Sequence, residues 1–194
     1  MADRPRLILG SGSPRRRDLL AQIGVIPDDI RAADIDEDPR PGERPLSYVT
    51  RLAREKSEAL SLADGEVLLT ADTTVCVGLR ILGKPAGAEE AAGFLRLMSG
   101  RRHKVITALA VRSADRMSER QVTTALRMTH LSADQIATYV ASGEWEGKAG
   151  GYAIQGAAGA FIPWLSGSFT GVVGLPLAET SALLRSYGIL EPAR

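Results

Sequence analysis

Short apolar runs alternate with segments of helical periodicity along the whole chain, and this alternation indicates a protein of the α/β class. The first apolar run is followed directly by a helix signal, because Ser13 suits an N-cap and Pro14 suits the first helical position. The same reasoning predicts strands over residues 7–9, 67–72, 104–111 and 122–129, with a strand or hairpin over 75–82. It predicts helices over residues 14–24, 45–62, 89–98, 133–143 and 176–188, with a loop over 27–44.

The composition limits what else the chain can be. Its 194 residues, 44% of them hydrophobic and 24% charged, can bury a substantial core and are unlike a disordered chain. Neither a linker nor an internal repeat divides the sequence, so we expect one domain over residues 1–194. The formal net charge of +1 argues against a dedicated nucleic-acid or membrane-surface binder.

Several features favour a cytoplasmic protein. No run approaches about 18 uninterrupted apolar residues, and no secretory apolar region follows the charged start at Met1–Arg6. The single cysteine, Cys76, cannot form an internal disulfide. With two isolated histidines and no CxxC pair, a zinc site of the usual His/Cys kind is not expected. We therefore assign Cys76, His103 and His130 to structural roles.

The segment Gly10–Arg17 places three arginines in the first turn of the expected helix, where the helix dipole disfavours positive charge. A bound phosphate removes this conflict, because it accepts hydrogen bonds from backbone N–H groups, serine hydroxyls and guanidinium groups together. The candidate phosphate ligands are Ser11, Ser13, Arg15 and Arg16. The alternative is a solvated basic helix start, and this alternative weighs most for Arg17.

Two charged residues stand in otherwise apolar patterns. Lys56 falls on the apolar stripe of the helix expected over 45–62, so it either snorkels to solvent or points into a ligand cleft. Asp72 ends an expected strand, where ligands collect in open α/β sheets. It either forms a turn or serves as a metal ligand or proton acceptor. Asp36 and Glu37 are candidates for a second carboxylate, although an acidic loop is most often only solvated.

Two glycine-containing segments resemble nucleotide-binding loops. Residues 78–85 nearly match a phosphate-binding P-loop, but Pro85 replaces the residue whose hydroxyl holds magnesium, so a hairpin explains the glycines better. Lys84 remains a candidate phosphate contact outside that motif. In the segment 147–156, glycines permit close backbone approach to a ligand, and the Gln155 amide can read a base. The alternative is a glycine-rich turn with an exposed glutamine.

Ordered motifs along nearly the whole chain resemble those of the Maf family of nucleoside triphosphate pyrophosphatases. They are Ser11-x-Ser13-Pro14-Arg15-Arg16-x-x-Leu19-Leu20, Leu52-Ala53-Arg54-Glu55-Lys56, Ala71-Asp72-Thr73, Gly83-Lys84-Pro85, Lys148-Ala149-Gly150-Gly151-Tyr152-x-Ile154-Gln155-Gly156 and Val172-Val173-Gly174-Leu175-Pro176.

The resemblance implies a mixed α/β fold similar to that of inosine triphosphatases, with a long twisted mixed sheet flanked by helices and two lobes around a central cleft. It implies hydrolysis of a nucleoside triphosphate between its α- and β-phosphates with a divalent metal, Mg²⁺ or Mn²⁺. By resemblance, Asp72 is the general base and, with Glu37, a metal ligand. The positions that match phosphate ligands are Ser11, Ser13, Arg16, Lys56 and Lys84, and those that match substrate choice are Arg15, Thr73 and Gln155.

The sequence of residues 152–156, Tyr-x-Ile-Gln-Gly, resembles that of the family branch that prefers dTTP, UTP and modified pyrimidine nucleotides. The branch that acts on 7-methyl-GTP departs at this motif. Thr74 and residues 169–171 depart from the usual family pattern, which affects the fine ranking of substrates rather than the reaction. Two alternatives stay open: a 7-methyl-GTP-type pyrophosphatase, and a nucleotide-binding regulator of cell division and septum formation. The resemblance also implies a homodimer.

Overall fold

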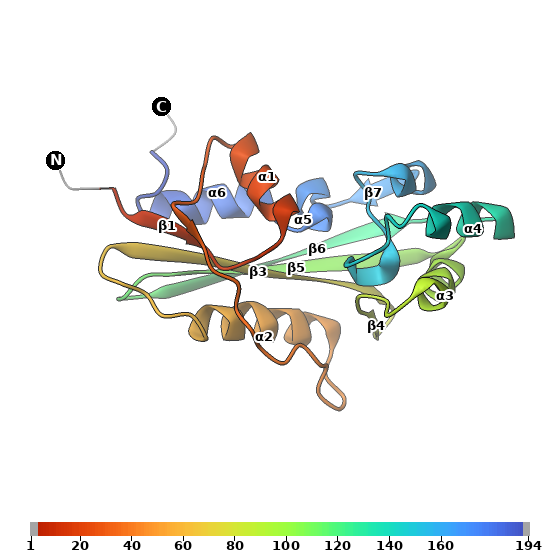
Figure 1. Ribbon diagram of the computed structural model, residues 1–194, viewed down its shortest axis with the longest axis horizontal. Helices are drawn as coiled ribbons and strands as arrows, with labels where there is room; N and C mark the ends of the chain where they lie inside the picture. The colour runs from red at the N-terminus through yellow and green to blue at the C-terminus, as the bar shows by residue number, and fades with distance from the viewer. Residues whose placement is uncertain (1–3, 192–194) are drawn as a thin grey trace.

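The computed structural model describes residues 4–191, in which seven strands form one mixed sheet with helices on both faces (Figure 1). The strands are β1 (Arg6–Leu9), β2 (Asp29–Ile30), β3 (Glu66–Val77), β4 (Arg80–Leu82), β5 (Arg102–Arg112), β6 (Met117–Arg127) and β7 (Trp164–Ser166). Their order is β2-β1-β3-β5-β6-β7, and β4 pairs with β3 outside this path. β1 is parallel to both of its neighbours, and the other pairs are antiparallel. The predicted mixed α/β class is confirmed.

The course of β3 corrects one prediction from the sequence. The strand was expected to end at Asp72, but it continues to Val77. β5 pairs with β3 along nearly its whole length, and the β-branched residues 73–75 suit this ladder, so the chain stays extended through Asp72. Asp72 therefore lies in the middle of a strand and forms no turn. The strand expected over 122–129 begins earlier, at Met117, because every residue of β6 is paired with β5.

Within the described residues, six α-helices pack on the sheet. They are α1 (Pro14–Gln22), α2 (Pro45–Glu58), α3 (Ala88–Met98), α4 (Ala133–Ala141), α5 (Phe169–Val173) and α6 (Leu177–Ser186). α2 ends at Glu58, before the predicted Leu62, and the chain then turns at Gly65 (φ +75°) to enter β3. α4 begins with a capping box, in which Ser132 and Gln135 exchange side-chain to backbone hydrogen bonds. None of these helices within residues 4–191 has the length and apolar character that a membrane span requires.

The core is divided into clusters along the sheet. One cluster lies between β1, α1 and α6 and contains Leu20 and Leu184. A second lies at the other end of the sheet, against α3 and α4, and contains Met98 and Leu126. A third packs α2 on the sheet through Leu52. The two ends of the molecule thus have their own cores on one continuous sheet, as the expected two lobes require (Figure 1).

The glycine-rich segment 143–174 is folded rather than a plain connection. It contains two 3-10 turns, Ala149–Gly151 and Ala157–Phe161, followed by β7 and α5. Gly150 has φ +70°, and a Cβ atom there would lie 2.8 Å from the side chain of Val75. Glycine is therefore required for this backbone to pack directly on β3.

Candidate active site

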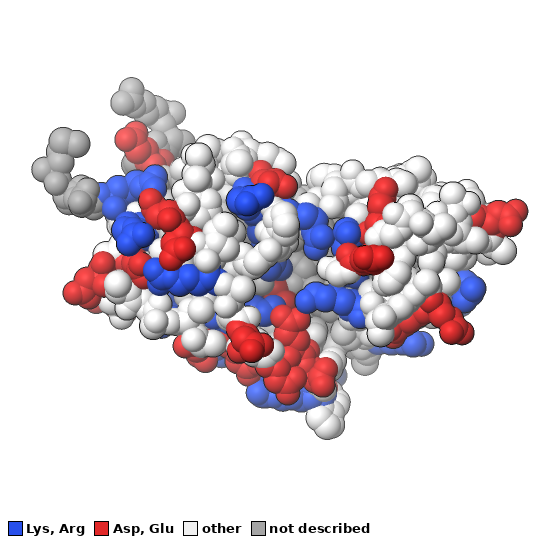
Figure 2. All heavy atoms as spheres, in the orientation of Figure 1, with Lys and Arg blue, Asp and Glu red and all other residues white. Residues whose placement is uncertain are grey.

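The candidate site lies at a gap in the edge of the sheet. β1 pairs with β3 up to Leu69 and β4 pairs with it from Val75, so residues 70–74 pair within the described chain with β5 alone. A cleft of about 480 Å³ opens beside this gap. Successive side chains of a strand point to opposite faces, so Asp72 and Thr73 reach the cleft from the two sides of β3. Figure 2 shows charged side chains of both signs around the middle of this face.

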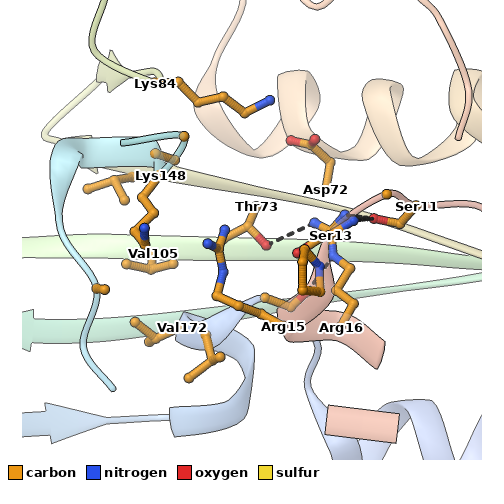
Figure 3. A pocket seen from close by; sticks show the side chains of 18 of the residues that line it. Ser11, Ser13, Arg15, Arg16, Asp72, Thr73, Lys84, Val105, Lys148 and Val172 are labelled. Carbon is orange, nitrogen blue, oxygen red and sulfur yellow. Dashed lines mark hydrogen bonds between the residues drawn. The ribbon is translucent and has the colours of Figure 1, made fainter. Parts of the chain in front are cut away.

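Four charged side chains meet on the α2 side of the cleft. The Lys56 ammonium lies 2.6 Å from Asp72 Oδ1 and 2.6 Å from Glu37 Oε1. The Lys84 ammonium lies 3.1 Å from the other oxygen of Glu37, and Figure 3 shows Lys84 pointing across the cleft toward Asp72. Lys56 is only 8% exposed and lines the cleft, so it does not snorkel to solvent. The structure thus favours the cleft interpretation of Lys56.

The loop that carries Glu37 is anchored to α2. The Tyr48 hydroxyl donates a hydrogen bond of 2.9 Å to the Glu37 backbone carbonyl. Burial alone would raise the pKa of Glu37, but hydrogen bonds and positive charge from Lys56 and Lys84 outweigh it and hold this pKa below its ordinary value. The neighbouring candidate Asp36 is exposed and does not line the cleft. Glu37 is therefore the second carboxylate of this site.

Arg16 joins three elements on the opposite side of the cleft. Its Nε donates to the Gly174 carbonyl at 2.9 Å, its Nη1 donates to Ser11 Oγ at 2.8 Å, and its Nη2 lies 3.5 Å from Thr73 Oγ1. Burial lowers the pKa of Arg16, while the charge of Asp72 acts in the opposite direction. Three of the five guanidinium N–H groups are engaged by protein atoms, and the other two are left for a ligand.

Arg15 and Lys148 form a second basic group in the cleft (Figure 3). Burial lowers the pKa of Arg15. The pKa of Lys148 is also lowered, first by burial and second by the positive charge of Arg15. Neither side chain forms an ion pair with a carboxylate among residues 4–191, so this part of the cleft favours a negatively charged ligand. Ser13 lines the cleft beside them, and its side chain does not cap α1. Lys148 was not predicted as a site residue, although it opens the glycine-rich motif.

The glycine-rich segment presents Gln155 to the cleft. The Gln155 side chain is exposed and lines the cavity. The backbone before it is held in place, because the Ala153 N–H donates to the Tyr139 hydroxyl at 3.0 Å. The Tyr152 hydroxyl lies 2.7 Å from Nε2 of the buried His103. Gln155 thus stands on an exposed turn, as the alternative states, but this turn lines the cleft and follows a backbone that is held in place.

Apart from the candidate Asp36, the cleft brings together the site residues predicted from the sequence, namely Ser11, Ser13, Arg15, Arg16, Glu37, Lys56, Asp72, Thr73, Lys84 and Gln155. Arg17 is exposed and lies outside the cleft lining, so the solvated alternative applies to it. The glycines of residues 78–83 belong to the β3–β4 hairpin, as expected. Cys76 is buried in the cluster under α2 and is not part of the cleft lining.

Comparison with known proteins identifies the family to which the chain is similar. The family model described as "Maf-like protein" matches residues 6–187. A dTTP/UTP pyrophosphatase of Cereibacter sphaeroides is 62% identical over 183 residues, which cover 94% of this chain and 95% of that protein. A dTTP/UTP pyrophosphatase of Roseobacter denitrificans is 61% identical over 181 residues, covering 93% of this chain and 96% of that protein. The crystal structure of a nucleoside-triphosphatase / dITP/XTP pyrophosphatase from Mycobacterium abscessus aligns with a TM-score of 0.42 and 14% identity, over 66% of this chain and 76% of that chain. With its motifs, its cleft and a family match over almost its full length, the chain belongs to the Maf family.

Proposed function

We propose that this protein is a nucleoside triphosphate pyrophosphatase that converts dTTP and UTP to the monophosphate and pyrophosphate. One observation carries the proposal: the Asp72 carboxylate lies 2.6 Å from the Lys56 ammonium in a cleft whose other side carries further cations. Attack of water on a triphosphate needs a proton acceptor beside groups that neutralise phosphate oxygens. The names of the relatives, dTTP/UTP pyrophosphatase, support the choice of substrate.

In this proposal, Asp72 orients a water molecule and accepts its proton. Lys56, Lys84 and Arg16 neutralise phosphate oxygens, and the hydroxyls of Ser11 and Ser13 donate hydrogen bonds to them. The residues that set substrate choice are Arg15, Thr73 and Gln155.

A divalent metal fits the donor set of the cleft. Magnesium is commonly held by one or two carboxylates together with substrate phosphates and water. Glu37 and Asp72 offer two carboxylates, and Asp72 Oδ2 accepts no hydrogen bond from residues 4–191. The described chain has no group of three or more His, Cys, Asp or Glu side chains suited to a metal, so substrate and water have to complete the coordination. We propose that Glu37 and Asp72 hold Mg²⁺ or Mn²⁺, which supplies positive charge at the phosphate oxygens.

A panel of nucleoside triphosphates tests the function. With Mg²⁺ or Mn²⁺ present, dTTP and UTP should release pyrophosphate, with pyrophosphate and orthophosphate measured separately. Purine triphosphates and 7-methyl-GTP should be poorer substrates. Orthophosphate as the first product, a preference for 7-methyl-GTP, or nucleotide binding without turnover would contradict the proposal. The last outcome would favour a regulatory binding protein.

The family resemblance leads us to propose a homodimer. The net charge of +1 leads us to propose that it has no affinity for nucleic acid, and the single cysteine and the absence of a long apolar run lead us to propose a cytoplasmic location. Analytical ultracentrifugation should give the mass of two chains. Salt-dependent retention on immobilised DNA would contradict the proposed lack of affinity for nucleic acid.

A further inference from the structure

A chain of three hydrogen-bonding groups runs from the cleft into the core behind it. Thr73 and Thr107 are paired across β3 and β5, and their hydroxyl oxygens lie 2.9 Å apart. The Thr107 oxygen also lies 2.7 Å from the backbone carbonyl oxygen of Gly171 in α5. Thr107 and Gly171 are buried, whereas Thr73 is half-buried and lines the cleft.

The direction of each hydrogen bond follows from the number of hydrogens. A carbonyl oxygen only accepts, so the single hydroxyl hydrogen of Thr107 points to Gly171. Thr107 must then accept from Thr73, and this uses the only hydroxyl hydrogen of Thr73. Arg16 Nη2, at 3.5 Å, is itself a donor and cannot receive that hydrogen. Thr73 is therefore left able only to accept a hydrogen bond from a group bound in the cleft.

Thr73 lies on the side of the cleft that holds the cationic Arg15 and Lys148, and apolar side chains on that side suit the flat ring of a base. The apolar side chains of Val105 and Val172 line the same part of the cleft (Figure 3). Thymine and uracil are imides whose N3–H is a donor between two carbonyl groups, whereas N3 of cytosine is an acceptor. An oxygen that only accepts pairs with the imide N–H and opposes a second acceptor.

We infer that Thr107 is a positioning residue that fixes the direction of the Thr73 hydroxyl and thereby selects imide bases over cytosine. The inference rests on the proposed function, because it assumes a pyrimidine nucleotide in the cleft. Thr107 is 1% exposed and is not part of the cleft lining, so its effect on selection passes through Thr73.

Substitution of Thr107 tests this role. Thr107→Val removes the acceptor for the Thr73 hydrogen at similar side-chain volume, and the freed hydroxyl can turn to donate to N3 of cytosine. The ratio of kcat/KM for dTTP to that for dCTP should then fall at least about tenfold. Thr107→Ser retains the hydroxyl and should keep the wild-type ratio.

Thr124→Val is the matched control. Thr124 is also a buried threonine, and its hydroxyl hydrogen-bonds to the backbone of Ser168, the N-cap of α5, without contact to Thr73. It should disturb α5 without changing the dTTP to dCTP ratio. A folded Thr107→Val protein with the wild-type ratio would overturn the inference, and so would an equal fall in Thr124→Val.

Two further measurements keep the test decisive. If Thr107→Val does not fold, Thr73→Val replaces it: loss of the acceptor should lower the ratio of kcat/KM for dTTP to that for dCTP at least about tenfold, and an unchanged ratio overturns the inference.

Calorimetric binding of dTMP and dCMP separates the inference from the proposed function. A wild-type protein that prefers dTMP but releases no pyrophosphate would refute only the function. One that hydrolyses dTTP and dCTP equally well would refute only the inference.

Discussion

Replacement of Lys56 by methionine removes a charge from the centre of the cleft and keeps a similar apolar stem. The ammonium contacts Asp72 and Glu37, each at 2.6 Å. If it also contacts a substrate phosphate, as we propose, that charge-assisted contact is worth about 1.5–3 kcal/mol. The kcat/KM for dTTP should therefore fall by about ten- to 160-fold.

The same substitution leaves the two carboxylates without their shared counter-ion. Removing one partner of a fully buried ion pair costs about 3–5 kcal/mol of unfolding free energy. The Glu37 side chain is 40% exposed, so water screens part of the loss and we expect a cost of about 1–3 kcal/mol at neutral pH. Lys56 and Lys84 hold the pKa of Glu37 below its ordinary value, so this contribution is present at neutral pH and is lost as the pH falls through that pKa. The difference in stability between wild type and variant should therefore shrink in acid.

Denaturant unfolding and dTTP hydrolysis, measured on one preparation, check both expectations. Lys104→Met is the matched control, because Lys104 is an exposed lysine on β5 outside the cleft, and it should change neither quantity appreciably. A lysine that only snorkelled would give a neutral or slightly stabilised Lys56→Met protein with normal kinetics. Normal kcat/KM in folded Lys56→Met would refute the phosphate contact.

Asp72→Asn should lower kcat by about 10²–10⁴-fold while dTTP binding, measured by calorimetry, is partly retained; a near-normal rate would mean that another group activates water. Glu37→Gln should raise the Mg²⁺ concentration that gives half-maximal rate, and an unchanged Mg²⁺ titration would exclude it as a metal ligand. Hydrogen bonds from Arg31 lower the pKa of Glu66 from 4.5 to about 2, so the stability gained is present above pH 4.5 and lost toward pH 2. Glu66→Gln should accordingly lower the Tm at pH 7 more than at pH 3, and equal losses would contradict this. Burial lowers the pKa of His103 from 6.5 to about 4, so wild-type stability should decline as the pH falls through this range. His103→Gln should flatten that slope, and an unchanged slope would mean that other groups titrate.

Much of the fold could be predicted from local patterns. The capping box at Ser132 fixed the start of α4, and Pro14 and Pro45 marked the first residues of two helices. These signals act through the backbone within one turn, so they are legible in the sequence alone. The middle of β3 could not be predicted in this way. Asp72 is a poor strand residue on its own, and it is kept extended by the hydrogen bonds that pair β3 with β5.

Charge patterns and family motifs predicted the ten site residues. They did not predict how these residues are arranged relative to one another. Lys56 and Asp72 are 16 residues apart in the chain, and the sequence left open whether either of them faced a ligand. Only the packing of α2 on β3 brings the ammonium and the carboxylate into contact and excludes snorkelling.

The sequence by itself determined which residues carry charge, where helices begin, and which family motifs the chain contains. The tertiary structure decided which of those groups share a cleft and what each can still bind. Arg15 and Arg16 look alike in sequence, but Arg16 donates hydrogen bonds to Ser11 and to the carbonyl of Gly174. The Arg15 side chain has no hydrogen-bond or ion-pair partner within residues 4–191 and faces the cleft. The difference arises because successive helical residues point about 100° apart, so their partners depend on the surfaces against which α1 packs.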